Sequence, residues 1–422
     1  MTGVNNVRRS PTARTKVLLV AGARPNYMKI APIYWAVARG ATDRLDAEIV
    51  HTGQHYDPSM SDDFFRDLAL PPPSINLEVG SGSHAEQTAK VLVGFEAVLR
   101  EKRPAIVVVV GDVNSTAACA LAAAKMHYEA ADPLPRPLIA HVEAGLRSRD
   151  RMMPEEINRM VTDAICDVLF TTCREADENL LAEGIPAQRI FFVGNPMIDS
   201  LLSRLDAARA CPMLDRLGLR DQPFGLCTLH RPSNVDRAPI LAEILAALGD
   251  IAADTPVLVP LHPRTRARLA AFGLAPRLVW LDGAMRAPQR GLIAIEPLSY
   301  LEMLSAMMAA HFVLTDSGGI QEETTALGVP CVTVRENTER PVTVSEGTNV
   351  LAGTTRRGIV DGLAEARRKT SGSVQVPELW DGRAGERIVA VLRELTGDAP
   401  ARLAGSRDAA TSFAAAGVGV AE

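Results

Sequence analysis

Short apolar runs alternate with longer helical segments along most of the chain, and this alternation restricts the possible folds more than any other feature. The run Ile106–Val110 reads Ile-Val-Val-Val-Val, so it carries no polar side chain that could face water. A strand that is apolar on both sides is buried on both faces, which is typical of a parallel sheet covered by helices. The sequence therefore predicts an α/β fold.

The alternation occurs twice, with an interruption near residues 200–222 that contains Pro212, Gly218 and Pro223. In the first half we expect strands at Lys16–Ala21, Glu48–His51, Ile106–Val110, Leu138–Val142, Val168–Thr171 and Ile190–Val193, and helices at Pro25–Arg39, Ala85–Arg103, Ser115–Tyr128, Pro154–Cys166 and Glu175–Glu183. In the second half we expect strands at Gly225–Thr228, Val257–Pro260, Leu292–Ile295, Phe312–Thr315 and Pro330–Val334, and helices at 237–253, 263–272, 299–310 and 318–327. These units predict two Rossmann-like domains facing a cleft, with ligands at the carboxyl ends of the strands.

The expected domain limits follow from these units. Residues 1–14 are polar and predict a disordered leader, residues 15–205 form the first domain, and residues 206–382 form a second, nucleotide-binding domain. We expect a last helix at 383–397 to pack back across the hinge. Residues 398–422 are rich in Ala and Gly and predict a flexible tail.

Composition excludes several classes of protein. The net charge of −5 argues against a nucleic-acid binder that relies on overall positive charge. No apolar stretch reaches the roughly 18 residues that a membrane-spanning helix needs. The six cysteines form no C-x-x-C pair and no zinc spacing, so we expect reduced thiols, no metal site and a cytoplasmic protein. Neither a G-x-x-x-x-G-K-[ST] nor a clean G-x-G-x-x-G motif is present, so we expect no ATP, no NAD and no other cofactor.

Two turns between a strand and a helix carry residues suited to a phosphate. In the first turn, which begins at Gly22, Arg24 and Lys29 are expected near a helix N-terminus, where free N–H groups favour an anion. The other interpretation is a plain turn with solvated cations. The stronger motif is Asp316-Ser317-Gly318-Gly319, in which paired glycines allow a phosphate to approach the backbone closely.

Charged residues flank the second turn. Glu322 and Glu323 follow one helical turn later, and they are expected to face neutral hydroxyls, such as a ribose diol, because they would repel a phosphate. Arg340 follows another strand and adds a cation to this region.

Several ionisable side chains are expected at the same edge of the sheets. Asp112, Glu143 and His230 each follow an apolar run, while Glu155 and Glu156 open a helix. The helix dipole explains one acid at a helix N-terminus, but it does not explain acids that end apolar strands. Carboxylates that share a site can divide into acid and base roles. Two further histidines are interpreted as structural hydrogen-bonding residues: His141 and His262.

The motifs recur in collinear order from residue 16 to residue 353, and two of them, His141–Arg147 and Asp316–Glu323, are highly specific in combination. The complete set is Gly22–Pro25 with Lys29, Thr52–His55, Gly111-Asp112, His141–Arg147, Pro154–Arg159, Gly194–Pro196, His230-Arg231, Asp316–Glu323 and Thr338–Pro341. This set resembles the non-hydrolysing UDP-N-acetylglucosamine 2-epimerases.

The resemblance implies a glycosyltransferase-B-like architecture, a homodimer, and interconversion of UDP-N-acetylglucosamine (UDP-GlcNAc) and UDP-N-acetylmannosamine (UDP-ManNAc). In the implied mechanism UDP is eliminated, 2-acetamidoglucal forms, and UDP adds back with the proton returned on the other face. The resemblance implies that the acids or bases are Asp112, Glu143 and Glu155, and that His230 and Arg340 contact the diphosphate. It implies that Glu323 binds the ribose, and that phosphate or sugar oxygens are bound by Arg24, Lys29, Ser317 and Gly318. Two further residues are implied in substrate binding: Arg147 and Gly319.

The chain departs from the family pattern at several positions. Asn26 replaces the commoner Glu, and Pro232-Ser233 replaces Arg or Glu followed by Glu. Some bacterial members are activated by a second UDP-GlcNAc, and Asp57 and Pro232 occupy the corresponding positions here. Proline offers no donor and aspartate repels a diphosphate, so we expect hyperbolic kinetics.

Alternatives of several classes remain at this stage. Relatives act on modified UDP-sugars, including 2,3-diacetamido uronic acids. A hydrolysing epimerase would release UDP and free N-acetylmannosamine, and a glycosyltransferase on the same fold would need an acceptor. A non-catalytic UDP-sugar-binding protein would normally have lost part of the carboxylate set, which this chain keeps.

Overall fold

The computed structural model describes residues 14–40, 44–54, 65–129, 134–281, 286–372 and 375–397, without the side chain of Arg24. Three earlier expectations therefore fall outside the described residues: the leader up to residue 13, the tail from residue 398, and the role of Asp57.

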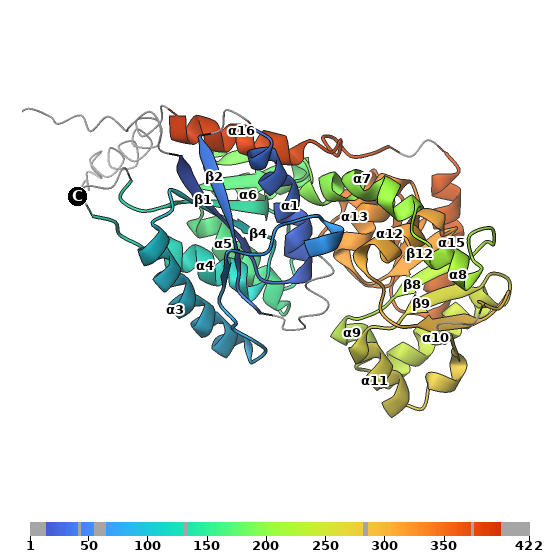
Figure 1. Ribbon diagram of the computed structural model, residues 1–422. Helices are drawn as coiled ribbons and strands as arrows, with labels where there is room; N and C mark the ends of the chain where they lie inside the picture. Colours follow the sequence, from blue (N-terminus) through green and yellow to red (C-terminus); the bar gives the residue numbers. More distant parts are fainter. Residues whose placement is uncertain are drawn as a thin grey trace, which may run out of the picture.

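Two seven-stranded parallel sheets form the framework, one in each half of the described chain (Figure 1). The first sheet has the order β3-β2-β1-β4-β5-β6-β7, built from β1 (Thr15–Ala21), β2 (Leu45–His51), β3 (Ile75–Asn76), β4 (Ile106–Val110), β5 (Leu138–Ala144), β6 (Val168–Thr171) and β7 (Ile190–Phe192). The second has the order β10-β11-β9-β8-β12-β13-β14, built from β8 (Gly225–Thr228), β9 (Val257–Pro260), β10 (Val279–Trp280), β11 (Leu292–Ile295), β12 (Phe312–Thr315), β13 (Cys331–Thr333) and β14 (Asn349–Leu351). The predicted α/β fold class is confirmed.

Helices connect the parallel strands, because a parallel pair needs a crossover connection. The first half contains α1 (Arg24–Ala38), α3 (His84–Lys102), α4 (Asn114–Ala124), α5 (Pro154–Ile165), α6 (Arg174–Ala182) and α7 (Pro196–Arg209). The second half contains α8 (Met213–Leu217), α9 (Pro232–Val235), α10 (Ala238–Ala252), α11 (Pro263–Ala271), α12 (Tyr300–Ala309), α13 (Gly318–Leu327), α14 (Val342–Ser345), α15 (Arg356–Thr370) and α16 (Ala384–Gly397). Among the described helices, none is both long enough and apolar enough to cross a membrane.

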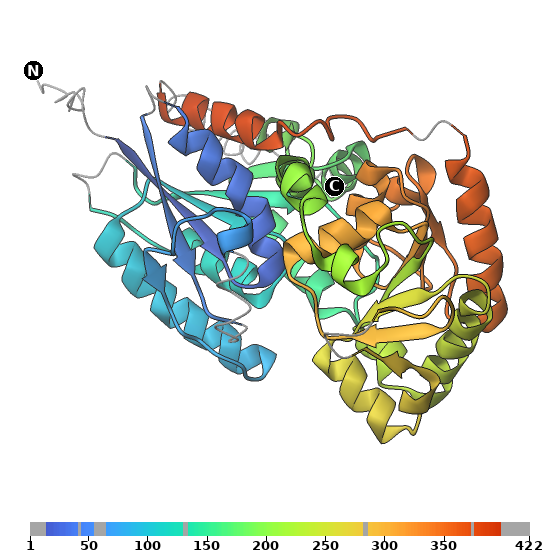
Figure 2. The same cartoon turned by 45° about the vertical axis from the view of Figure 1, so that its right-hand side comes forward.

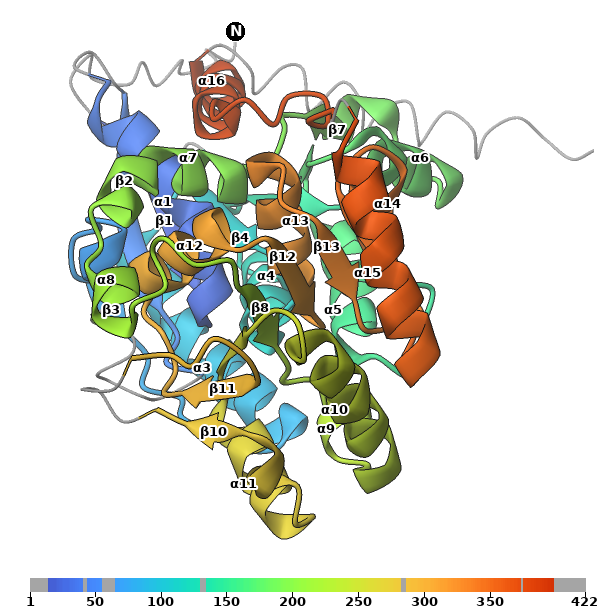
Figure 3. The ribbon, with the colours of Figure 1, turned by 90° about the vertical axis from the view of Figure 1, so that its right-hand side faces the viewer.

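Both faces of the second sheet are covered. Along its strands, neighbouring residues alternate between two buried clusters, since Leu226 belongs to one cluster and Cys227 to the other. Helices α10 and α15 cover one face, and α12 covers the opposite face, nearer to α7 (Figure 3). This burial on both faces explains why the strand sequences are continuously apolar rather than alternating.

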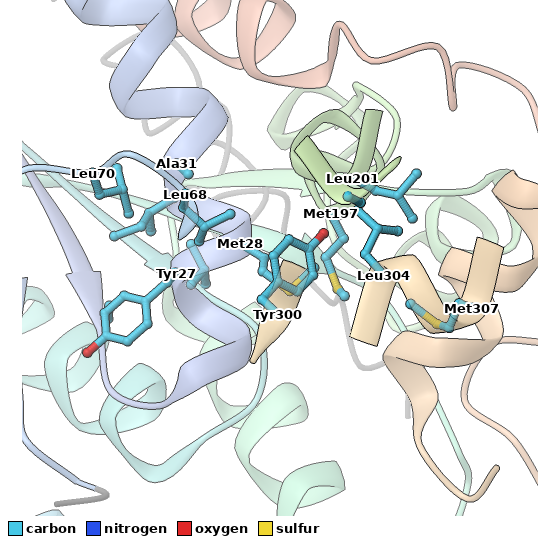
Figure 4. Close-up of a cluster of buried hydrophobic side chains, with 14 of the residues drawn as sticks. Tyr27, Met28, Ala31, Leu68, Leu70, Met197, Leu201, Tyr300, Leu304 and Met307 are labelled. Atoms are coloured by element: carbon cyan, nitrogen blue, oxygen red, sulfur yellow. The ribbon is translucent and has the colours of Figure 1, made fainter. Parts of the chain in front are cut away.

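One hydrophobic cluster continues from the first domain into the second. It contains Tyr27 and Met28 of α1, Met197 of α7, and Tyr300 and the rest of the apolar face of α12, all buried (Figure 4). Helix α7 contacts α1 on one side and α12 and α13 on the other. The expected domain boundary between residues 205 and 206 therefore falls inside a continuous helix, and the two domains share part of their core.

The chain returns to the first domain at its end, where α16 lies along α1 (Figure 2). Asp199 of α7 caps α16, because its carboxylate accepts hydrogen bonds from the backbone N–H groups of Ala384 and Gly385, at 3.1 and 2.7 Å. The indole of Trp380 donates to the carbonyl of Thr172 at 2.9 Å and anchors the segment before the helix. These contacts fix the last helix on the first domain, as a helix packing back across the hinge requires.

Candidate active site

Glu143 stands at the carboxyl end of β5 in an unusual backbone conformation. Its φ is +70°, in the left-handed region that a non-glycine residue seldom adopts, and the pairing of β5 with β6 shifts register between Val142 and Ala144. Such a bulge redirects a side chain at the end of a strand, and strained residues of this kind are concentrated at functional sites. The bulge turns the Glu143 carboxylate toward the second domain.

Two cations from different domains hold this carboxylate. Lys29 Nζ donates to Glu143 Oε1 at 2.8 Å, and Arg340 Nη2 lies 3.1 Å from the same oxygen. All three side chains are buried. The second oxygen, Oε2, is buried without a hydrogen-bond partner among the described residues. An unsatisfied buried acceptor costs about 1–3 kcal/mol, so Oε2 is an acceptor that a bound substrate would satisfy.

Arg340 is the centre of the network. Its Nε lies 3.0 Å from Glu322 Oε2, and its Nη1 lies 2.8 Å from Glu339 Oε1. The guanidinium covers the start of α13, where a Cβ added to Gly318 would lie only 2.7 Å from Arg340 Nη1. A larger residue at this position would require the side chains of Arg340 and Glu339 to shift. A fixed cation beside a helix N-terminus suits an anion, as the sequence predicted for this turn.

The two acids of α13 do not share the role that we expected. Glu322 points at Arg340 rather than at a neutral group, because a buried carboxylate needs an opposite charge. Burial, together with the charge of Glu143, raises the pKa of Glu322 to about 7, although Arg340 counteracts this rise. Burial also raises the pKa of Glu323 to about 8, with a contribution from Glu322. The ribose-binding role of Glu323 stays a prediction.

Asp112 follows β4 through Gly111 and pairs with Arg159 of α5. The Arg159 Nη2 to Asp112 Oδ2 distance is 2.8 Å, and Arg159 Nη1 also binds Glu156 at 2.5 Å. Burial raises the pKa of Asp112, but the charges of Arg159, Lys29 and Arg340 outweigh burial, so the pKa lies below its usual value. Asp112 is therefore an ionised carboxylate within the electric field of the same cations that hold Glu143.

Glu155, the third residue with a predicted acid–base role, lies outside the buried ion network. Glu155 is exposed at the start of α5, whereas its neighbour Glu156 is buried and accepts hydrogen bonds from the backbone N–H groups of Ser148 and Arg149. The structure thus does not bring Glu155 into the buried network, and its acid–base role stays a prediction. Glu156, one position later, serves to hold the segment before α5.

Two residues of the His141–Arg147 block have internal partners. His141 contacts Asp163 through Nδ1 at 2.6 Å and the Gly111 carbonyl through Nε2 at 2.8 Å, which agrees with the structural role that we assigned to it. Arg147 pairs with Asp163 at 2.8 Å and with Glu183 at 2.7 Å. The guanidinium of Arg147 therefore stabilises the loop, and its role in substrate binding stays a prediction.

The side chain of Asn26 fills the turn between β1 and α1. Asn26 Oδ1 accepts hydrogen bonds from the backbone N–H groups of Gly22 and Ala23, both at 2.9 Å, and Asn26 Nδ2 donates to the Val110 carbonyl at 3.2 Å. Asn26 thus already satisfies these two backbone groups, and the predicted binding of phosphate or sugar oxygens by Arg24 and Lys29 stays a prediction. Of the two cations expected here, Lys29 faces Glu143, while the side chain of Arg24 lies outside the described structure.

His230 follows β8 and is partly exposed, with Nδ1 2.9 Å from Asp316 Oδ1. The next residue, Arg231, lies 3.3 Å from Glu339, so the histidine loop joins the Arg340 network. Glu339 also binds Arg335 at 2.9 Å. The cations around Glu339 hold its pKa well below the usual range against the effect of burial, so this carboxyl group is ionised.

The predicted motifs contain four residues whose partners in the site the sequence did not indicate: Arg159, Asp316, Glu322 and Glu339. One signal was available, since Asp316 ends an apolar strand just as Asp112 and Glu143 do. The i, i+3 spacing of Glu156 and Arg159 was another signal. Together the site holds carboxylates beside fixed cations, a combination suited to proton transfer next to an anion.

Comparisons with known proteins show the family to which the chain is similar. The sequence profile of a family described as UDP-N-acetylglucosamine 2-epimerase matches residues 38–393. A UDP-N-acetylglucosamine 2-epimerase of Methanocaldococcus jannaschii is 40% identical over 382 residues, covering 89% of this chain and 98% of that protein. A UDP-2,3-diacetamido-2,3-dideoxy-D-glucuronate 2-epimerase of Pseudomonas aeruginosa is 40% identical over 359 residues, covering 84% and 93%. A crystal structure of the Methanocaldococcus jannaschii enzyme in complex with UDP-GlcNAc and UDP superposes with a TM-score of 0.78 at 39% identity, covering 90% of this chain and 100% of that chain.

Proposed function

Because the chain belongs to the UDP-N-acetylglucosamine 2-epimerase family, we propose that it interconverts UDP-GlcNAc and UDP-ManNAc without hydrolysis. The observation that carries the proposal is the buried contact of Glu143 with both Lys29 and Arg340. A carboxylate for proton transfer and cations that neutralise a diphosphate are the two parts that an elimination needs. The adjacency of a carboxylate and two cations supports the proposal.

The chemistry explains why the two parts must be adjacent. The proton on C2 of an N-acetylhexosamine is not acidic, so its direct removal is slow. When the C1–O bond breaks, its electron pair leaves with UDP, positive charge develops at C1, and the C2 proton becomes acidic. A carboxylate takes this proton, and 2-acetamidoglucal forms. UDP then adds back to C1 while a proton returns to C2 on the opposite face.

We assign separate roles in this reaction to the cations and to the carboxylates of the site. Lys29, Arg340 and His230 stabilise the charge that develops on the departing diphosphate, which is usually the largest electrostatic contribution to such a reaction. Asp112 and Glu143 share the two proton transfers at C2. The buried cations hold both carboxylates in fixed positions, so the reaction needs little reorganisation of charged groups.

A product assay tests the proposal. UDP-GlcNAc alone, without an acceptor, is incubated with the protein and followed by proton and phosphorus NMR. We expect UDP-ManNAc to accumulate until both nucleotide sugars are at equilibrium. Release of UDP with free N-acetylmannosamine would instead identify a hydrolysing epimerase, and no conversion at all would refute an epimerase of this substrate.

A second candidate substrate rests on the Pseudomonas aeruginosa relative, which is as similar to this chain as the archaeal enzyme. That relative is named for a UDP-2,3-diacetamido uronic acid. Measuring kcat/KM for both nucleotide sugars with one enzyme preparation decides between them. A higher value for the uronic acid would assign the modified sugar as the substrate and leave the elimination mechanism unchanged.

A further inference from the structure

Asp316 is a buried carboxylate that the proposed mechanism does not yet use. It ends β12, which lies next to β8 in the sheet with Thr315 opposite Thr228. Because parallel strands end at the same edge, the residues after β8 reach Asp316 directly. Its side chain is fully buried beneath the loop that carries His230.

Among the described residues, the donors to the Asp316 carboxylate come from this loop and from α9, which follows it. Nδ1 of His230 lies 2.9 Å from Oδ1, and the backbone N–H groups of His230 and Arg231 donate at 3.1 and 3.0 Å. The side-chain amide of Asn234 donates to Oδ2 at 3.2 Å. Burial raises the pKa of Asp316, but the hydrogen bond and charge of His230 outweigh burial and hold the pKa below its usual value. Asp316 is thus ionised and acts only as an acceptor.

This geometry determines where the imidazole carries its proton. A ring nitrogen that contacts an ionised carboxylate must be the donor, so Nδ1 of His230 holds a hydrogen. The remaining nitrogen, Nε2, lies on the opposite side of a ring that is partly exposed. When a carboxylate fixes the tautomer of a histidine in this manner, the second ring nitrogen can be directed at a reacting group.

We propose that Asp316 is a positioning residue for the reaction: it fixes the Nδ1–H tautomer of His230, so that only Nε2 addresses the departing diphosphate. The inference rests on the proposed function for the identity of the reaction. When Nε2 also carries a proton, the ring is a cation that donates a hydrogen bond to the leaving oxygen, and Asp316 balances its charge. Since Ser317 follows Asp316 directly, the same carboxylate fixes the distance between the histidine and the start of α13.

The tautomer can be measured without any substrate. In nitrogen-15 spectra of the full chain, the signals of His230 are assigned as those that disappear in His230→Gln. We expect the neutral ring of the wild-type protein to carry its proton on Nδ1. In Asp316→Asn the proton is expected to move wholly or partly to Nε2. A wild-type ring protonated on Nε2 would overturn the proposal.

Asn234→Ala is the matched control for this measurement. This substitution removes one hydrogen bond that the carboxylate of Asp316 accepts. The charge of Asp316 and its contact with the imidazole ring stay in place. The Nδ1–H tautomer is expected to persist in this variant. A tautomer change as large as that in Asp316→Asn would mean that the packing of the loop, rather than the carboxylate, controls the ring.

A double-mutant cycle separates positioning from folding. Asp316→Asn alone is expected to lower kcat by about 10²-fold or more, with a smaller change in KM. In a His230→Gln background the same substitution is expected to change kcat by less than about threefold, because its target is gone. An equal loss in both backgrounds would show that Asp316 acts through the fold alone. If the wild-type protein converts no UDP-sugar, the proposed function fails, while the tautomer measurement still decides the inference about Asp316.

Discussion

The substitution Arg340→Met gives a direct test of the ion network between the domains. The guanidinium lies within 3.1 Å of three carboxylates, on Glu143, Glu322 and Glu339, and all four side chains are buried. Methionine keeps much of the apolar volume but leaves the carboxylates without their shared cation. Removing one partner of a buried ion pair costs about 3–5 kcal/mol, so we expect a loss of about this size in the free energy of unfolding.

The loss is expected to depend on pH through Glu322. Burial raises its pKa to about 7 while Arg340 counteracts this, so the pKa rises further when Arg340 is removed. A carboxyl group whose pKa is raised in the folded state lowers the stability progressively as pH rises from its unfolded pKa to its folded pKa, and no further above that. For Glu322 this range ends at about pH 7 in the wild-type protein and extends to higher pH when Arg340 is removed. The destabilisation by Arg340→Met is therefore smaller near about pH 5.5 than near about pH 8.

Urea denaturation followed by circular dichroism measures the effect as a shift of the midpoint at both pH values. Arg356→Met is the matched control, because Arg356 pairs with Asp250 at 2.5 Å on the surface, where both side chains are about half exposed. Exposed pairs contribute little to stability, so the control is expected to leave the midpoint nearly unchanged. A midpoint shift for Arg340→Met that is no larger than the control, or that is the same at both pH values, would refute the network as described.

Three further outcomes follow from the site. Asp112→Asn and Glu143→Gln are each expected to lower kcat by about 10²-fold or more with little change in KM, and full activity in Glu143→Gln, measured by product NMR, would remove that residue from the mechanism. Turnover is expected to survive EDTA, because Lys29 and Arg340 supply the positive charge that the diphosphate needs; loss on chelation that Mg²⁺ or Mn²⁺ restores would contradict this. Initial rates are expected to be hyperbolic in UDP-GlcNAc, since Pro232 offers no side-chain donor for a second nucleotide sugar, and a sigmoidal curve would show that such a site is intact.

The central strands could be read from the sequence because burial on both faces leaves a continuous apolar run. Ile106–Val110 and Phe312–Thr315 have the predicted limits. The strands that were missed, β3, β10 and β14, lie at or near the edges of the sheets and have only two or three residues, too few to show a period. The helix predicted at Ser115–Tyr128 ends instead at Ala124, before a segment in which the backbone of Tyr128 donates to the Pro135 carbonyl.

The start of helix α7 has a sequence signature from which the helix could have been predicted. Asn195 caps it by accepting from the backbone N–H of Met197, and Pro196 occupies its first turn, which is a typical helix start. We interpreted the prolines and glycine after it as a domain boundary. The helix ends at Arg209, before these residues, but it crosses the expected boundary between residues 205 and 206 and packs against both α1 and α12.

The site was predictable only in part, for a physical reason. An acid that ends an apolar strand must lie at the carboxyl edge of the sheet, which identified Asp112 and Glu143 from the sequence alone. The partner of a buried charge depends on how two domains pack, so the pairing of Arg340 with Glu143 across the domain boundary could not be predicted from the sequence. Nor did the sequence indicate that Asn26 would fill the first turn.

The most direct test of the account is the fate of the C2 proton. UDP-GlcNAc is converted in deuterium oxide, and both nucleotide sugars are followed by proton NMR. Elimination and re-addition require a proton from an enzyme group that exchanges with solvent, so we predict that UDP-ManNAc forms with deuterium at C2. UDP-ManNAc that keeps the original hydrogen at C2 throughout would contradict proton transfer through exchangeable carboxylates, and with it the central claim about Asp112 and Glu143.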